Sequence, residues 1–588
     1  IFAYHLYLED MRSCRELRCL STPTPMIDST GNSSNISSCL LDISAGDLES
    51  VSTLVKFLES VLASSLSDVT LGSDAPQILY SILNCVSCSA FSEEVTNALS
   101  FELPKAIAEF AGISDECAAL VDRILDSLSE KCSPRDMLTI LCEALGLTNQ
   151  SKNPSKYAPP LFTSLSKVIC CIQRRPFEQI ATVIPIVLNV LRSLTLVMGD
   201  DDDFFNLFQK ALSIADSIQA AREKLDVKAK ESIGSLIALY TMQVMALLSI
   251  CMGTNISCFT IVNKISSILL LCNCSYLGLI TGSDVEKHSR ITKRMDEDSF
   301  DNCFSNLRLG AAMTVIFYEA SDAKALESLK EELRCDQIKG WEALAMVRHA
   351  LCADKISWKL KQHAIELLLY ITIPPSVHQE QLSDSSFHLL SVFPTLQSLT
   401  IIVIHAPSKD LRTKSFEVLK RVVAVVPSSM KLESLQLLMT KSESTHMKAL
   451  LIDLMRGELQ RAMNDVKKFP LLWTEDVLMM VEMVLKPSEG GPPKLPENGE
   501  EVLASMNLFR FVLMAESARK SNYTGVLSKE KLERVHSQWL LPLRGFLHRI
   551  RVENDDMEDA LCCINLLEMV LYRCLELVEE NQKIFNKS

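Results

Sequence analysis

The stretch Ile356–Glu458 repeats one pattern three times: LKQHAIELL at residues 360–368, LRTKSFEVL at 411–419 and MKALLIDLM at 447–455. Each copy has apolar or small residues at its first, fifth, eighth and ninth positions, which form one stripe along a helix. A basic residue follows the first apolar position every time. The copies begin 51 residues apart (411 minus 360) and 36 residues apart (447 minus 411). These spacings bracket the ~40-residue period of HEAT-like helix pairs, and the longer one holds an insertion at 372–386.

Two shorter apolar stretches, at 394–404 and 432–439, lie between the copies and are expected to form partner helices. Pro407-Ser408 and Pro427-Ser428 separate them from the copies, because Pro ends one helix and Ser can cap the next. A helix pair this short buries its apolar face only by stacking on its neighbours. The sequence therefore predicts an all-α fold, a HEAT-like helical-repeat solenoid. The alternative is an irregular helical bundle with a chance pattern match.

The composition narrows both fold and partners. Only 18 of the 588 residues are Gly, far below the usual share of about 7%, which argues against folds full of tight βα turns. The formal net charge is −14, so bulk electrostatics disfavour nucleic acid and anionic membranes as main partners. We expect neither among the partners.

The cysteines and acidic runs are expected to be structural. The 20 cysteines fall mostly within apolar helical patterns, which is typical of buried thiols in a cytosolic or nuclear protein. Cys85-x-x-Cys88 has no second pair or His at zinc spacing, so we expect core helix and no metal. The run Asp200–Asp203 precedes Phe204 and is expected to start a helix, where unpaired N–H groups favour acids.

One long apolar stretch could be mistaken for a membrane span. Ile233–Met252 carries no charge over 20 residues, which is long enough to cross a bilayer. Polar residues dilute it and no Lys/Arg cluster flanks it, so a buried solenoid helix is expected instead. Residues 1–20 mix charged with apolar residues, so no signal peptide is expected. These features favour a location in the nucleus, the cytoplasm or both.

Composition changes divide the chain into five segments. They are an N-terminal segment with a mobile Ser/Thr/Pro-rich loop (1–46), N-terminal helical repeats (47–300), HEAT-like repeats (301–485), a linker (486–500) and a C-terminal helical partner-binding region (501–588). The linker reads KPSEGGPPKLPENGE and lacks apolar periodicity. The last helix is expected to bury one seam, formed by Leu561, Ile564, Leu567, Leu571, Cys574 and Val578.

No catalytic motif is evident. The sequence contains no P-loop, G-x-G-x-x-G, G-x-S-x-G or H-E-x-x-H pattern, and its His residues are scattered singly. We therefore expect no enzyme, no catalytic residue, no cofactor and no small-molecule substrate. A helical-repeat protein instead presents long surfaces to other proteins.

Three stretches near the C-terminus resemble the glomulin family: WLLPL at 539–543, ALCC at 560–563 and VLYRCLELVEE at 570–580. The Ser/Cys-rich N-terminal half looks closest to the plant branch of that family, the aberrant lateral root formation proteins. The resemblance implies an all-helical HEAT-like protein whose C-terminal part binds the RING-box subunit of cullin–RING (SCF) ubiquitin ligases, together with the cullin. It implies that the bound protein covers the surface used by the ubiquitin-conjugating enzyme and so inhibits the ligase. For plants it implies a role in auxin-dependent protein turnover and lateral root formation.

The last two helices are expected to supply the partner surface. Trp, Tyr and Arg most often dominate interface energies, so the candidates are Trp539, Arg544, His548, Arg549, Arg551, Tyr572 and Arg573, with Glu576 beside them. The alternative is an ordinary solvated basic face with Trp539 in the core. The alternative function is a helical-repeat scaffold or transport adaptor, although no ladder of Trp or Asn for cargo is evident.

Overall fold

The computed structural model describes residues 32–65, 74–87, 92–197, 202–251, 258–292, 302–321, 326–373, 389–463, 469–486, 493–553 and 558–585. Within these ranges every regular element is a helix and there is no strand, so the all-α prediction is confirmed. The chain divides into two compact units, which we call unit 1 (to Leu225) and unit 2 (from Asp226). This division falls inside the segment 47–300. Most of the predicted N-terminal loop, Cys88, Asp200 and residues 374–388 lie outside the described residues.

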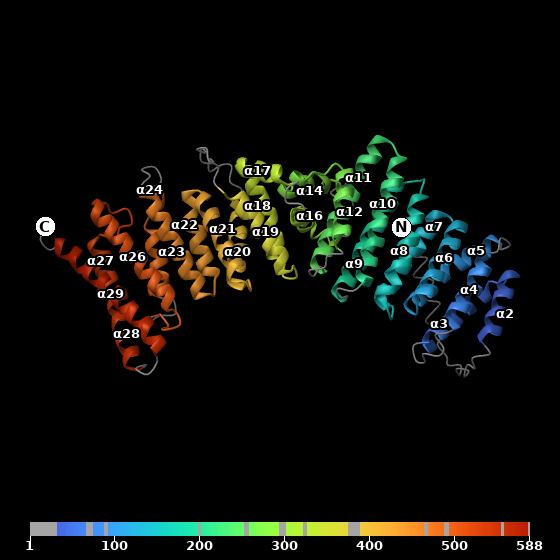
Figure 1. The fold of residues 1–588 in the computed structure, drawn as a ribbon, viewed down its shortest axis with the longest axis horizontal. Coiled ribbons are helices and arrows are strands. Elements are labelled where there is room, and N and C mark those ends of the chain that lie inside the picture. The colour runs from blue at the N-terminus through green and yellow to red at the C-terminus, as the bar shows by residue number, and fades with distance from the viewer. Residues whose placement is uncertain are drawn as a thin grey trace. The chain divides into compact units, whose positions relative to one another are not determined.

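Unit 1 is a two-layer stack of helices (Figure 1). Its helices are α2 (Asn32–Ser44), α3 (Glu49–Ser65), α4 (Ala75–Ser87), α5 (Glu93–Ala108), α6 (Asp115–Lys131), α7 (Pro134–Gly146), α8 (Pro154–Cys170), α9 (Pro176–Val197) and α10 (Asp202–Glu223), with the 3-10 turns η2 (Glu109–Gly112) and η3 (Thr148–Gln150). The even-numbered helices pack in series in one layer, and α3, α5, α7 and α9 pack in series in the other. Each helix therefore contacts mainly its near neighbours in sequence, as in a solenoid.

Serine caps set several helix starts in unit 1. Ser92, Ser114 and Ser133 each accept a hydrogen bond from the amide three residues later, which satisfies an N–H that would otherwise lack a partner. The expected acidic helix start is confirmed at Asp202. One difference concerns α2, which begins at Asn32, inside the stretch predicted as a loop.

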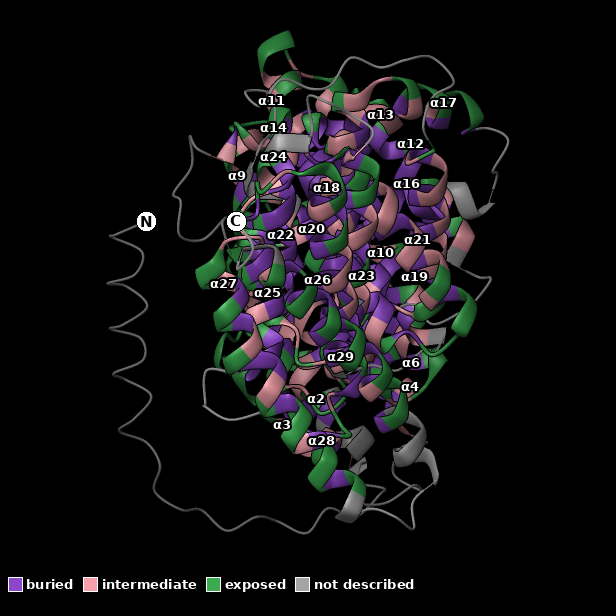
Figure 2. Cartoon of the chain, turned by 90° about the vertical axis from the view of Figure 1, so that its left-hand side faces the viewer, coloured by how far each residue is buried: buried purple, intermediate pink, exposed green. Residues whose placement is uncertain are grey.

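Unit 2 contains the remaining elements. They are α11 (Val227–Cys251), α12 (Cys258–Leu271), α13 (Tyr276–Thr281), α14 (Ser283–Ser289), α16 (Leu307–Ser321), α17 (Glu327–Cys335), α18 (Gln337–Cys352), α19 (Trp358–Ile371), α20 (Leu389–His405), α21 (Lys409–Val425), α22 (Ser428–Lys441), α23 (Thr445–Ala462), α24 (Phe469–Leu472), α25 (Asp476–Leu485), α26 (Gly499–Arg519), α27 (Lys529–Arg534), η6 (Val535–Leu540), α28 (Leu541–Glu553) and α29 (Glu558–Phe585). Buried residues line the inner sides of the helices and exposed residues lie on the outer turns (Figure 2).

The apolar helix α11 is a core helix of unit 2. Two helices are long and apolar enough to cross a membrane by composition: Pro176–Leu196 in unit 1 and Val227–Cys251 in unit 2. Of the most apolar 18-residue stretch in each helix, 61% and 89%, respectively, is buried inside the protein. Helix α16 packs closely on α11, because a Cβ at Gly310 would lie 1.8 Å from the Met242 carbonyl oxygen. Such an approach requires glycine. Burial against α16 accounts for the absence of charge that the sequence shows here.

The repeat predicted from the three sequence copies is confirmed. The copies lie in α19, α21 and α23, and the four stripe positions of every copy are buried. The expected partner helices are α20 and α22, which pack against α21 and α23. Ser357 and Ser444 cap α19 and α23 by accepting amide hydrogen bonds. Ser408 occupies the N-cap position of α21 without a capping hydrogen bond from its side chain.

The predicted linker 486–500 lies between helices that pack together. Helix α26 begins at Gly499, within the predicted linker, and packs against both α23 and α25. Leu495 is buried, at 9% exposure. The Pro- and Gly-rich composition therefore marks a connection between packed helices, and unit 2 continues across it.

Candidate functional site

The candidate site lies on the last two helices of unit 2, α28 and α29. Helix α29 buries the expected seam: Ile564, Leu567, Leu571, Cys574 and Val578 are each 0% exposed. The side chain of Leu561 is outside the described residues. Burial raises the pKa of the Cys574 thiol to about 12, so this thiol stays protonated and acts as a small apolar group.

Helix α26 fixes the position of α29. The Cys574 thiol donates to the Met506 carbonyl oxygen at 3.6 Å, and the Ser517 hydroxyl donates to Asn581 Oδ1 at 3.2 Å. Both contacts join α29 to α26 over more than sixty intervening residues. Because α29 is packed against α26 within unit 2, the position of its outer face is fixed.

The basic candidates are exposed but differ in what they contact. Arg551 pairs with Glu568 on α29 at 2.8 Å, and Arg573 pairs with Glu576 at 2.9 Å. Arg549 lies over the Phe546 ring, 5.7 Å from its centroid. Among the residues that the structure describes, neither Arg544 nor His548 has a carboxylate partner.

Arg551 consequently joins α28 to α29, which together form a helical hairpin, and the charge of Arg573 is neutralised by Glu576. Arg544 and His548 are the basic candidates that remain available on the surface.

Trp539 corrects one expectation about the aromatic candidates. It is 4% exposed and lies in the π-helical segment η6 that leads into α28, so its ring supports helix packing and is not offered to a partner. Pro542, two residues after the end of η6, has no N–H to donate to the carbonyl four residues before it. A missing bond of this kind accompanies irregular helical turns. Tyr572, by contrast, has 51% of its surface exposed.

Two apolar residues that sequence reasoning assigned no role join Tyr572 on the outer face of α29. Leu566 is 47% exposed and Met569 is 64% exposed. With Tyr572 they recur every three residues and form one exposed stripe opposite the buried seam. The sequence could have predicted their exposure, because both residues lie outside the seam of α29 and apolar residues outside a core stripe remain on the surface.

One ion pair relates the basic face of α28 to α29. Arg544, His548 and Arg551 recur at intervals of four and three and share one face of α28. The Arg551–Glu568 pair sets the register with α29. The chain reverses between the two helices, so one turn back from Arg551 corresponds to one turn forward from Glu568, which reaches Tyr572. We call the surface formed by Arg544, His548, Leu566, Met569 and Tyr572 the C-terminal ridge.

A second cluster in unit 2 contains a cysteine and a histidine, the residue types of a nucleophile and its base, but it is buried. Cys274 Sγ lies 3.4 Å from His288 Nε2, and His288 Nδ1 lies 3.0 Å from the Ser235 hydroxyl. Cys274 and His288 are 5% and 4% exposed. Burial raises the pKa of the Cys274 thiol to about 12, with the negative charge of Asp284 adding to the effect. A reactive cysteine needs a depressed pKa and an open approach, and this cluster has neither.

No group of three or more His, Cys, Asp or Glu side chains within the described ranges could hold a metal ion. Cys85 lies in α4 and is half-buried. Charged and apolar side chains are exposed on the last two helices of the described chain.

Comparison with known proteins identifies relatives over most of the chain. The model of the family described as "Uncharacterised protein family, YAP/Alf4/glomulin" matches residues 41–373 and 342–582. The Arabidopsis thaliana "Aberrant root formation protein 4" is 36% identical over 569 residues, which are 92% of this chain and 90% of that protein. The human "Glomulin" is 22% identical over 147 residues, which are 25% of this chain and 24% of that protein.

Among solved structures, a circular tandem repeat protein is similar, with 12% identity, a TM-score of 0.25 and coverage of 94% of this chain and 97% of that one. The structure of SYS-1 is similar with 11% identity, a TM-score of 0.23 and coverage of 93% and 86%. These scores are too low to establish a shared fold. The family match and the 36% identity over nearly the whole length are sufficient by themselves: the chain belongs to the YAP/Alf4/glomulin family.

Proposed function

We propose that this chain is a non-enzymatic regulator that binds the RING-box subunit of a cullin–RING ubiquitin ligase, with its cullin, through the C-terminal ridge. The observation that carries the proposal is the ridge itself: Leu566, Met569 and Tyr572 form an exposed apolar stripe on α29, and Arg544 and His548 are exposed on the preceding helix α28. Aromatic, Met and Arg side chains are enriched at interfaces, and a few such anchors dominate their energy. Family membership supports the choice of partner, through the resemblance to glomulin.

The bound chain would inhibit the ligase by occupying the RING surface that the ubiquitin-conjugating enzyme needs. Inhibition by exclusion requires no catalytic group. The printed name of the Arabidopsis relative supports a role in root formation, and we extend this role to auxin-dependent protein turnover. Such a regulator would act in the nucleus or the cytoplasm.

A binding and ubiquitin-transfer assay with purified components tests the proposal. The full chain is titrated onto a RING-box–cullin complex, and transfer of ubiquitin from its conjugating enzyme is followed. Met569→Asp should weaken binding by about 2 kcal/mol, roughly thirtyfold, if Met569 is a central anchor. Arg544→Glu should weaken it by a smaller amount, mainly through slower association.

The matched control is Met479→Asp, which changes a similarly exposed methionine, 52% exposed, on α25. Its affinity and inhibition should equal those of the unchanged chain. If the unchanged chain neither binds the complex nor slows ubiquitin transfer, the ligase proposal fails. A scaffold or adaptor that serves other proteins would then account better for the surface.

A further inference from the structure

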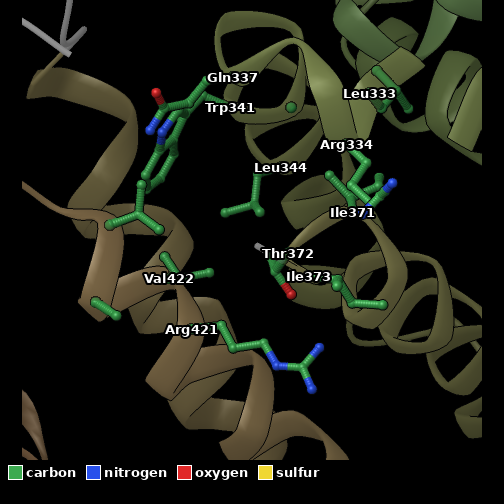
Figure 3. A pocket seen from close by; sticks show the side chains of 13 residues that line it. Leu333, Arg334, Gln337, Trp341, Leu344, Ile371, Thr372, Ile373, Arg421 and Val422 are labelled. Atoms are coloured by element: carbon green, nitrogen blue, oxygen red, sulfur yellow. The ribbon is translucent and has the colours of Figure 1, made fainter. Parts of the chain in front are cut away.

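A pocket of about 200 Å³ lies in unit 2, away from the C-terminal ridge, where helices α17, α18, α19 and α21 meet (Figure 3). Its apolar lining includes Trp341, Leu344, Ile371 and Val422. A cavity of about 150 Å³ is large enough to hold benzene. The pocket therefore has room for one bulky apolar side chain, such as that of Leu or Phe.

The inner wall of the pocket is already formed in the folded chain. Leu333, Leu344 and Val422 are 1%, 4% and 2% exposed, so their neighbours hold them in place. A Cβ at Gly340 would lie 2.8 Å from the Leu333 carbonyl oxygen, which shows how closely α17 and α18 approach beside the pocket. A preformed wall favours binding, because little side-chain freedom is lost when a ligand enters.

The mouth of the pocket keeps apolar surface in contact with solvent. Ile373 is 39% exposed and Val425 is 44% exposed, and both line the pocket. Burying such side chains releases free energy in proportion to the apolar area removed from water. The mouth thus adds to the area that an inserted group would cover.

Two arginines are the charged residues of the lining, and each is held by a carboxylate from outside the pocket. Arg334 donates Nε to Glu331 at 2.9 Å and Nη2 at 2.5 Å. Arg421 donates Nε to Glu417 at 3.1 Å and Nη1 to the Leu369 carbonyl oxygen at 2.9 Å. Among the described residues, Nη1 of Arg334 and Nη2 of Arg421 have no acceptor. Figure 3 shows both arginines beside the apolar lining.

We propose that this pocket binds an acidic peptide segment of another protein. One bulky apolar side chain of the segment enters between Trp341 and Val422, and its carboxylates accept hydrogen bonds from Arg334 Nη1 and Arg421 Nη2. Charge complementarity determines the class of ligand, because charge-assisted hydrogen bonds from a fixed guanidinium favour carboxylates. A basic segment offers no acceptor to these donors, and an uncharged acceptor forms a weaker hydrogen bond with them than a carboxylate does.

A displayed library of short peptides provides the probe. Each peptide carries one Leu, Phe or Trp within random positions drawn from acidic, amide and basic residues, and the library is selected against the full chain. We expect enrichment of peptides with carboxylates flanking the apolar residue. A synthetic copy of the strongest peptide, labelled with fluorescein, then gives an affinity by polarisation.

Three variants and one control locate the binding. Ala424→Phe adds a ring at an exposed position of the lining and should abolish binding without removing a buried group. Arg334→Gln and Arg421→Gln should each weaken binding by about tenfold, as expected for loss of a hydrogen bond to a charged group. Lys420→Gln removes a positive charge beside Arg421 on the same helix but outside the lining, and should leave the affinity unchanged. Circular dichroism of each variant confirms that it is folded.

Several outcomes would overturn the proposal. They are a selection that enriches no peptide or enriches uncharged or basic ones, an affinity that Ala424→Phe leaves intact, and equal losses for Arg421→Gln and Lys420→Gln. Sedimentation analysis tests whether a second copy of this chain occupies the pocket instead. A dimer that Ala424→Phe dissociates would show that the pocket is a self-association surface.

Discussion

Replacing Glu458 should destabilise unit 2 strongly, because Glu458 belongs to a buried ion pair. Glu458 Oε2 lies 2.7 Å from Lys431 Nζ, and the two side chains are only 4% and 7% exposed. Arg461 Nη2 lies 2.6 Å from the other carboxylate oxygen. In Glu458→Ala the ammonium of Lys431 stays buried and keeps a hydrogen bond to the Ala424 carbonyl oxygen, but it loses its neutralising charge.

Removing one partner of a buried pair costs about 3–5 kcal/mol. If unit 2 unfolds cooperatively, its roughly 360 residues at ~2.1 cal/mol/K per residue give an unfolding entropy near 0.8 kcal/mol/K, so a loss of 3 kcal/mol lowers Tm by about 4 °C.

A double-mutant cycle is the assay that separates the pair from its surroundings. Glu458→Ala, Lys431→Met and the combined variant are melted side by side, with circular dichroism as the readout. Replacing both charges by apolar groups is often neutral or stabilising, so the combined variant should recover most of the loss seen in Glu458→Ala. The effects of contacting residues are not additive, and the cycle measures this coupling. A combined variant as unstable as the sum of the two single variants would refute the reasoning.

Three further outcomes are expected. Gly310→Ala should cost at least about 3 kcal/mol, because its methyl group would meet the Met242 carbonyl oxygen and force α11 and α16 apart, and thermal melting measures the loss. Burial raises the pKa of Glu501, so its ionised form opposes folding. Stability falls as pH rises through the folded pKa, and Glu501→Gln should raise Tm at about pH 8 but hardly at about pH 4. With its pKa raised to about 12, Cys274 should react with an alkylating reagent at about pH 8 at least a thousandfold more slowly than the exposed Cys171, as mass spectrometry of labelled peptides would show.

The repeat could be predicted from sequence because it rests on local patterns. The apolar stripes at 360–368, 411–419 and 447–455 predict which face of each helix is buried, and all of the stripe positions are buried in the structure. The same periodicity found the seam of α29. Such patterns report which face of a helix is apolar, and in a solenoid the apolar face packs on the neighbouring repeat.

The surface chemistry could be predicted only in part. Exposure of Tyr572 followed from its position off the seam of α29, whereas the burial of Trp539 depends on helices that pack around it. Met569 is the most exposed apolar member of the ridge, and its residue type alone favoured the core. The Arg551–Glu568 contact joins residues of two helices, and local periodicity cannot predict it. The composition of the predicted linker also does not reveal that α25 and α26 pack together.

The π-helical segment Val535–Leu540 has a consequence for how the ridge can vary among related chains. A π turn accommodates one more residue than an α turn, and each residue of an α-helix turns the direction of the next by about 100°. The wide turn absorbs its extra residue locally, so deleting one residue here would restore an α turn and leave Arg544 and His548 on the same face of α28. Hydrophobic packing of Leu543 and Leu547, both nearly fully buried, holds α28 in this orientation. A single deleted codon at this point would thus shorten the chain without re-aiming the basic face of the protein.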